Sequence, residues 1–437
     1  MTEREQSKEY YKNKDYENAI ILYDKLWNLS NKDDHNLFAE YGNALRKVNK
    51  SEVFIKEFSK INKDSYLRKN NYVISVLCWC VYDVYIKDYI DTEESDFEKF
   101  IKMAEFITKY SKQKTGINEI LTPFVLTVKK VVKIYSNKPS SRTSKKNQEK
   151  IIEWLKKLDP SILSEECLIT KVGDDEYEQA SSKEYYYQNI VKAYEKMGEY
   201  EKCIAVGENS LKLIAKFHYK NKIWITGRIL FSKCMIPSDK EIDLQNYKKF
   251  AEKENYWFLW YKLANVCYSF GMFKESLLYN CKAIYNERID EKMVTLLYNL
   301  GLCWDSQGNQ ENSKKYYHAS AYFRNLMGWN LSEELQYYIF NYNLDVVKKP
   351  NMHELKSIAK EYIDKNDDEY LYGKIDNILK NGFSGFIKPD SGIDNIYFNM
   401  RNVICNKNLL QRDKKVKYKK IVNEKGKTEA ICVEGVK

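Results

Sequence analysis

The chain has 437 residues, of which 43% are hydrophobic and 31% are charged, and its formal net charge is +10. This balance excludes wholesale disorder. Its 16 glycines and 6 prolines are too few for a large β-sandwich or a doubly wound sheet, which need many tight turns, so the composition predicts a mainly helical protein.

The cysteines and the apolar segments exclude several classes of protein. Most of the ten cysteines stand singly within apolar stretches, as small buried side chains do, and no CxxC pair provides zinc-ribbon spacing. The N-terminus, Met1–Glu9, is too polar for a signal peptide, and the longest apolar run, Tyr72–Tyr85, is too short to cross a bilayer. We therefore expect a cytoplasmic protein with no membrane partner.

Three segments share one pattern. A large residue is followed three and four positions later by an apolar and a small residue, then by a glycine, and then by a second helical stretch with a small residue. The large residues are Tyr187, Trp260 and Leu297, and the glycines are Gly198, Gly271 and Gly308. The pattern predicts helical hairpins, because small residues let antiparallel helices approach closely and a glycine ends the first helix.

These hairpins resemble the tetratricopeptide repeat (TPR) family. The resemblance extends to the N-terminus, where Tyr16, Ala19 and Tyr23 match a repeat and Phe38–Leu45 opens a weaker copy. It implies an α-solenoid whose concave groove binds a protein or peptide partner. We expect TPR-like repeats in residues 1–50, an irregular helical region in 51–180, and TPR-like repeats with closing helices in 181–366.

Two features of the helical part have alternative interpretations. Tyr194, Trp260 and Trp304 lie where a ligand in the groove would contact them, but their helical spacing is more typical of core residues. The polar, basic stretch Ser136–Lys150 predicts an exposed loop, whose lysines are either solvated or a second place for nucleic acid to bind.

The pattern changes after Glu369, where apolar residues alternate with polar ones and glycines cluster. Alternation indicates strands, and we expect them at 370–378, 383–388, 395–399, 415–422 and 428–434. Turns are expected at 389–392 and 423–426. Five short strands predict a small β-barrel of the oligonucleotide-binding (OB) kind in residues 369–437. The segment is also basic, since Lys374–Lys437 holds 14 Lys and Arg against 7 Asp and Glu.

The motifs of this segment resemble the cold-shock domain. Gly373 precedes the run Gly385-Phe386-Ile387 at about the interval found in that family, and Asp394 is followed by two large residues, Tyr397 and Phe398. The full expectation is therefore a mainly α chain, a TPR-like α-solenoid followed by a five-stranded OB or cold-shock-like β-barrel.

The cold-shock resemblance implies a site for single-stranded RNA or DNA. Phe386 and Tyr397 match the family's stacking residues, and Lys374, Lys388 and Arg401 are placed to follow the phosphate backbone. Side chains two apart on a strand share a face, so aromatic residues on adjacent strands form a surface on which bases stack.

The chain departs from the cold-shock pattern at several positions. Ser384 stands in place of a second stacking aromatic, unless a bulge brings Phe383 there, and Asn377, Asn399 and Met400 replace the usual tryptophan, histidine and aromatic residue. We keep Phe383 and Asn399 among the candidate nucleic-acid-binding residues. The departures leave an alternative in which the barrel serves protein contacts and its aromatic residues pack against the helices.

No motif indicates an enzyme. The chain has no phosphate-binding loop, no GxSxG and no HExxH sequence, and its four histidines are widely separated. Asp174-Asp175-Glu176 has the charge to bind a divalent ion, but such runs usually lie in solvated loops. We expect no catalytic residue, no cofactor and no metal.

Three hypotheses for function follow. The first is a non-enzymatic adaptor that binds single-stranded nucleic acid, RNA favoured, through the barrel and a protein partner through the solenoid. The second is a purely protein-binding regulatory scaffold whose barrel binds no nucleic acid. The third is a peptide-sensing regulator, which ranks last because peptide receptors of this kind usually begin with a helix-turn-helix domain and this chain begins in a repeat.

Overall fold

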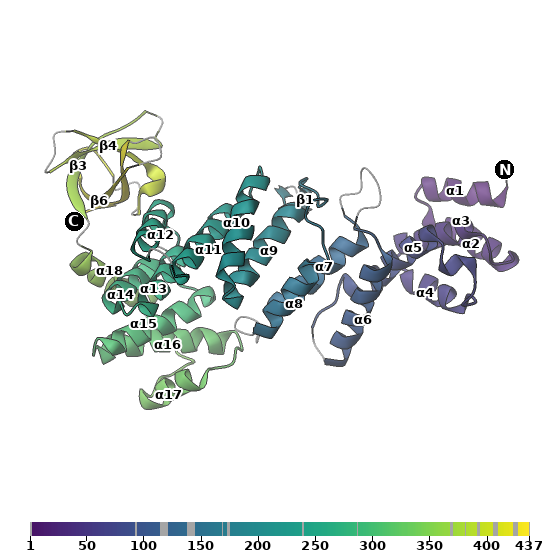
Figure 1. The fold of residues 1–437 in the computed structure, drawn as a ribbon, viewed down its shortest axis with the longest axis horizontal. Coiled ribbons are helices and arrows are strands. Elements are labelled where there is room, and N and C mark those ends of the chain that lie inside the picture. Colours follow the sequence, from purple (N-terminus) through teal and green to yellow (C-terminus); the bar gives the residue numbers. More distant parts are fainter. Residues whose placement is uncertain are drawn as a thin grey trace. The chain divides into compact units, whose positions relative to one another are not determined.

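The fold is described here from a computed structural model. The structure describes residues 2–91, 94–113, 121–137, 145–167, 169–172, 175–237, 240–285, 287–367, 370–380, 382–390, 394–404, 410–422 and 427–436. The chain divides into two compact units, Met1–Lys222 and Ile223–Lys437. Both units contain paired helices, and the second also carries a β-barrel (Figure 1).

The first unit is built from helices that pack against their neighbours in sequence. They are α1 (Glu3–Lys12), α2 (Tyr16–Leu29), α3 (His35–Lys47), α4 (Ser51–Lys60), α5 (Asn71–Val81), α6 (Glu94–Tyr110), α7 (Pro123–Asn137), α8 (Lys145–Leu155), α9 (Ser182–Met197) and α10 (Tyr200–Leu213). A short 3₁₀ helix, η1 (Tyr66–Arg68), precedes α5, and a π-helix, η2 (Tyr82–Ile86), continues it. At the turn between α1 and α2, Lys14 takes the left-handed conformation (φ 64°) that glycine takes in later hairpins.

The region between the repeats differs from the sequence-based expectation in two respects. A two-stranded antiparallel sheet joins β1 (Ile169–Val172) to β2 (Asp175–Glu178). The side chains of β2 are all exposed, so no alternation marks it in the sequence. The expected loop Ser136–Lys150 is partly wrong, because its first two residues end α7 and Lys145–Lys150 begin α8; residues 138–144 lie outside the described residues.

The second unit continues with helices and adds the barrel. The helices are α11 (Asn221–Met235), which contains the boundary, α12 (Lys240–Glu254), α13 (Trp257–Ser269), α14 (Phe273–Tyr285), α15 (Val294–Ser306), α16 (Gln310–Leu326), α17 (Glu333–Asn341) and α18 (Met352–Asn366). A 3₁₀ helix, η4 (Glu291–Met293), leads into α15.

The hairpins α13–α14 and α15–α16 follow the predicted pattern. Gly271 and Gly308 sit at their turns with φ near 74°, a conformation that favours glycine. Gly301 lets α15 and α16 approach, since a Cβ there would lie 2.5 Å from the Tyr317 ring. Trp260 and Trp304, like Tyr194 in the first unit, are buried, in agreement with their interpretation as core residues.

The C-terminal strands close into a barrel. They are β3 (Leu371–Ile378), β4 (Ser384–Pro389), β5 (Ile396–Asn399), β6 (Lys415–Val422) and β7 (Thr428–Gly435), and η5 (Met400–Asn402) follows β5. The order around the barrel is β3-β4-β5-β7-β6, with β5 and β7 parallel and the other neighbours antiparallel. This confirms the predicted fold class of a helical-hairpin chain followed by a five-stranded barrel.

The barrel core explains why the strands were recognisable. Ile375, Ile387, Phe398, Val416 and Val433 point inward and are fully buried, and alternate residues point outward. Residues 391–392 of the first expected turn and all of the second expected turn, 423–426, lie outside the described residues. Across the described part of the chain, no helix has the length and apolar character needed to span a bilayer.

Candidate nucleic-acid interface

Phe386 on β4 and Tyr397 on β5 lie directly opposite each other across the two strands. Their ring centroids are 5.7 Å apart and the rings are inclined by 71°, an edge-to-face contact. Both side chains are half-buried and point away from the core, because the inward positions beside them are taken by Ile387, Ile396 and Phe398. The two predicted stacking residues are thus neighbours on the outer face of the barrel.

A row of lysines runs beside this aromatic pair. Lys374 on β3 pairs with Lys388 on β4 in one direction and with Lys415 on β6 in the other, and all three are exposed. Like charges placed directly opposite each other destabilise a sheet slightly, so a polyanion on this row would relieve their repulsion. We call the outward side chains of β3, β4 and β5, with the lysine row, the open face.

The remaining predicted residues occupy different positions around the open face. Asn399 is outward on β5, and its Oδ1 accepts a hydrogen bond from the Arg401 backbone N–H (3.0 Å), which places exposed Arg401 in η5. Ser384, opposite Asn399, is buried and begins β4. Phe383 lies just before β4 and is 73% exposed, and its carbonyl accepts from the Met400 N–H. Met400 itself is in the core, so it offers no stacking ring.

The outer face of β6 and β7 is occupied instead by a charge cluster, which we call the docking cluster. Strand residues in it face acidic and basic residues of the helices. Its ion pairs are Lys419–Asp367 (2.8 Å), Lys419–Glu252 (3.4 Å), Lys282–Asp367 (2.7 Å), Lys417–Glu434 (3.3 Å), Lys360–Glu434 (2.7 Å) and Lys417–Asp364. Four lysines therefore meet four carboxylates between the barrel and α12, α14 and α18.

Burial sets the protonation behaviour of the docking cluster. Burial, together with the positive charge of Lys419, lowers the pKa of Lys282 to about 8. Burial opposes the charge of Lys360 as well, but its hydrogen bond and attraction to Glu434 outweigh this and raise its pKa. Burial and the nearby Glu434 raise the pKa of Tyr285 to about 12, so its hydroxyl remains a donor to that carboxylate (2.9 Å).

The docking cluster fixes which side of the barrel remains accessible. β6 lies on the side toward α18 and β4 lies on the other side (Figure 1). Phe386 and Tyr397 are carried on β4 and β5, whereas the strand residues in the ion pairs of the docking cluster come from β6 and β7. Among the described residues, the ring contact of each is with the other, so the alternative in which the two rings pack against the helices has no support.

A cleft of about 1140 Å³ lies between α12 and the barrel. Asn399 and Arg401 line it together with residues from β6, β7 and α12. Its lining has six basic side chains and three acidic ones; the basic ones are Lys248, Lys249, Lys253, Arg401, Lys419 and Lys420. Because Tyr397 on β5 pairs with cleft residue Glu429 on β7, the open face leads directly into this basic cleft.

Sequence reasoning missed part of this surface. Lys415 was not singled out, although its alternation with buried Val416 marks it as outward. No sequence feature marked the lysines of α12 as part of this surface, because only the tertiary fold brings α12 beside β7. The charge count was partly misleading, since Lys417 and Lys419 contribute to the basic C-terminal segment but are buried in the docking cluster.

Comparisons with known proteins identify no family for this chain. No family model matches the chain, and no curated protein matches it. Among solved structures, the chain is similar to the C-terminal part of a TPR repeat-containing protein from Cytophaga hutchinsonii, with 11% sequence identity and a TM-score of 0.29. The match covers 77% of this chain and 98% of that one. Because the likeness is this remote, the assignment to helical hairpins rests on the helices themselves.

Proposed function

We propose that this chain is a non-enzymatic adaptor that binds single-stranded nucleic acid on the open face of its barrel and a protein partner on its helical hairpins. The observation that carries the nucleic-acid proposal is the separation of the two barrel faces. β6 and β7 are committed to the helices, whereas the aromatic pair and the exposed lysines stand on β3, β4 and β5. RNA is favoured over DNA only through the resemblance to the cold-shock domain.

The physical chemistry of the open face supports this proposal. In OB barrels the face formed by the second and third strands binds oligonucleotides, and these strands are β4 and β5 here. Each stacked base contributes about 1–3 kcal/mol, and lysines beside the rings neutralise phosphates and release counterions. The path from Tyr397 past Asn399 to Arg401 and the basic cleft gives the strand a route beyond the two stacked bases.

The helical hairpins support a protein-binding role. Stacked helical repeats commonly bind peptides or protein surfaces along their exposed helices. α17, near the end of the repeats, exposes Tyr337 and Phe340, which are the kind of side chains that anchor protein contacts. A scaffold that binds protein only is the second candidate, and this exposed pair is the observation that favours it.

Fluorescence anisotropy of the full chain with short labelled single-stranded RNA and DNA tests the proposal. The variant is Phe386→Ala/Tyr397→Ala, and the matched control is Tyr337→Ala/Phe340→Ala, which removes two exposed rings from α17. We expect the barrel variant to lose about 30-fold or more in affinity, with two stacked bases lost, and the control to bind as the wild type does.

Two results would contradict this function. Equal binding by the barrel variant and the wild type would place the nucleic-acid site elsewhere. If the folded wild-type chain does not bind nucleic acid at low salt, the adaptor proposal is wrong and the protein-binding scaffold is the remaining candidate. A circular-dichroism melt of each variant separates a lost contact from a lost fold.

A further inference from the structure

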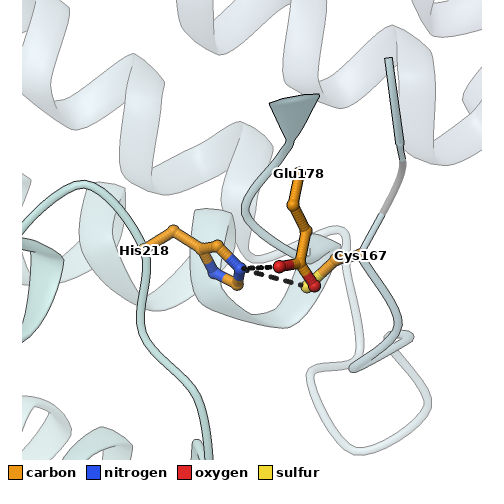
Figure 2. A group of neighbouring side chains, drawn as sticks. All are labelled: Cys167, Glu178 and His218. Atoms are coloured by element: carbon orange, nitrogen blue, oxygen red, sulfur yellow. Dashed lines mark hydrogen bonds and ion pairs between the residues drawn. The ribbon is translucent and has the colours of Figure 1, made fainter. Parts of the chain in front are cut away.

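Three side chains from separate segments of the first unit converge at one point (Figure 2). Cys167 precedes β1, Glu178 ends β2, and His218 lies in the turn between α10 and α11. His218 Nε2 lies 3.5 Å from Cys167 Sγ and 3.5 Å from Glu178 Oε2, and the three potential ligand atoms all lie within 4.8 Å of one another. None of the predicted functions uses these residues.

A buried carboxylate holds the imidazole in place. Glu184, on α9, is fully buried, and its Oε2 lies 2.7 Å from His218 Nδ1. Its Oε1 accepts hydrogen bonds from the His218 backbone N–H and from Asn221 Nδ2, both at 2.7 Å. Because a carboxylate only accepts, Nδ1 carries a hydrogen, and Nε2, which faces Cys167 and Glu178, is the nitrogen left to coordinate a metal. Metal-binding histidines are oriented by carboxylates in this way.

The two separations measured from His218 Nε2 fit a tetrahedral metal site. Zinc bonds of about 2.3 Å to sulfur and about 2.0 Å to nitrogen and oxygen give ligand separations of about 3.5 Å and 3.3 Å in a tetrahedron. Both measured separations from Nε2 are 3.5 Å. A thiolate, an imidazole and a carboxylate together are a donor set for Zn²⁺, whereas Mg²⁺ and Ca²⁺ prefer oxygen alone.

The same residues resemble a cysteine nucleophile with its histidine base, but the electrostatics disfavour that interpretation. His218 Nε2 lies 3.5 Å from the Glu178 carboxylate, the same separation as from Cys167 Sγ, so the histidine does not face the thiol alone. A nucleophilic cysteine is activated by positive neighbours, whereas this site places a carboxylate beside the thiol. A negative group at the third corner of the site is what a bound cation requires.

We propose that Cys167 Sγ, Glu178 Oε2 and His218 Nε2 bind one divalent cation of the zinc class, with water in the fourth position. On binding, the thiol gives its proton to solvent, and the cation replaces Lys216, whose Nζ now lies 2.5 Å from Glu178 Oε2. The site would tie the β1–β2 hairpin and the turn after α10 to α9, within the first unit.

The test begins with the full chain stripped of metal by a chelator. Zn²⁺ affinity is measured by competition with a chromophoric chelator, and Co²⁺ is added in parallel as a spectroscopic probe. We expect one equivalent of Zn²⁺ to bind, and Co²⁺ to give a thiolate charge-transfer band with the intense d–d bands of a tetrahedral site. A wild-type chain with no tight Zn²⁺ site and no such spectrum would overturn the proposal without any variant.

Variants assign the ligands. Cys167→Ser and His218→Gln should each weaken Zn²⁺ binding by at least about 100-fold, and Glu184→Gln, which only positions the imidazole, by about 10- to 100-fold. His353→Gln, an exposed histidine on α18, is the matched control and should bind Zn²⁺ as the wild type does. Undiminished binding by the first two variants would place the metal elsewhere and overturn the assignment.

Alkylation of Cys167 tests the site in the wild-type chain, so the result does not depend on whether a variant folds. Iodoacetamide labelling followed by peptide mass spectrometry should show Cys167 modified in the metal-free chain and protected by Zn²⁺. Equal modification with and without Zn²⁺ would contradict the site. A Cys167 that reacts faster than free glutathione and binds no metal would also overturn the proposal and favour the nucleophile.

Discussion

On the outer face of β6 and β7, lysines and carboxylates are buried in pairs, whereas on the outer face of β3, β4 and β5 the lysines stand exposed beside two aromatic rings. The residue types overlap, but their surroundings differ. Lys417 and Lys419 are almost fully buried and reach carboxylates of the helices, while Lys374 and Lys388 are exposed and lie opposite each other across two strands. Position relative to the helices, and not composition, decides what each lysine does.

The comparison teaches how one small barrel can serve two purposes. Burying an ion pair costs desolvation energy that its attraction repays only when geometry is good, so the docking cluster specifies how the barrel sits more than it adds stability. The open face avoids this cost, because its charges remain hydrated until a polyanion arrives. Substitutions should therefore affect folding on one face and binding on the other.

The largest expected effect is on the docking cluster. Asp367→Ala removes the carboxylate shared by Lys282 and Lys419, which takes an ion-pair partner from buried Lys282 and leaves Lys419 paired with Glu252. We expect a loss of about 3–5 kcal/mol in free energy of unfolding, measured by urea denaturation. The control Glu333→Gln, an exposed carboxylate on α17, should change it by less than about 0.5 kcal/mol.

A double variant sharpens this prediction. Lys282→Met/Asp367→Leu replaces one buried ion pair by apolar side chains of similar volume and keeps the Lys419–Glu252 pair, and it should recover most of the stability lost in Asp367→Ala. If Asp367→Ala unfolds no more easily than the control, the buried lysines do not depend on the Asp367 carboxylate. The distinction between the two faces then fails.

The next effect is on the open face. Tyr397→Ala removes one half-buried ring and should weaken single-stranded RNA binding by about 5- to 150-fold, the range for one stacked base, while unfolding changes little. Anisotropy titration measures the RNA affinity, and urea denaturation measures the free energy of unfolding. Tyr337→Ala on α17 is the matched control. A Tyr397→Ala protein that binds normally but unfolds easily would mean that this ring is structural.

The sequence predicts the barrel well because its signals are local. Alternation marks β4 and β5 to within a residue or two, and Gly385 is needed because a Cβ there would lie 2.5 Å from the carbonyl oxygen of Asn377. The expected first strand begins one residue early, since Tyr370 instead packs with the helices, where Lys417 and Lys419 lie over its ring.

The docking cluster and the Cys167 site escape sequence reasoning for a different reason. Lys419 and its partner Glu252 are separated by 167 residues, and His218 lies 51 residues beyond Cys167, so no spacing rule joins them. In the sequence, a buried lysine in an ion pair cannot be distinguished from a lysine that binds phosphate. Only the fold distinguishes Lys417 from Lys388.

The third prediction concerns the charge of the open face. Lys374→Gln/Lys388→Gln should lower the slope of log affinity against log salt by about 1.4, because each phosphate contact to a single strand contributes about 0.7. When the salt is raised from 50 to 200 mM, the double variant should therefore lose about sevenfold less affinity than the wild type. Lys365→Gln, an exposed lysine on α18, should leave the slope unchanged. An unaltered slope in the double variant would remove these lysines from the nucleic-acid path.

The smallest effect is a pH dependence of folding from the docking cluster. The pKa of Lys282 falls to about 8 in the folded chain, by burial and by the charge of Lys419, against an ordinary value of 10.5. Between these values Lys282 holds more protons in the unfolded chain, so its contribution to stability rises with pH. From pH 7 to 8.5 we expect the wild type to gain under about 1 kcal/mol relative to Lys282→Met.

Cys432, which also faces Lys282, titrates differently in the folded and unfolded chain. Burial raises its pKa to about 12 in the folded chain, whereas an unfolded cysteine has a pKa of about 8.5. This difference lowers stability as pH rises, so the contribution of Lys282 is the difference between wild type and Lys282→Met over the same window. Equal pH dependence in the two proteins would show that Lys282 stays fully charged, because the docking cluster would then be wetter and less costly than its burial implies.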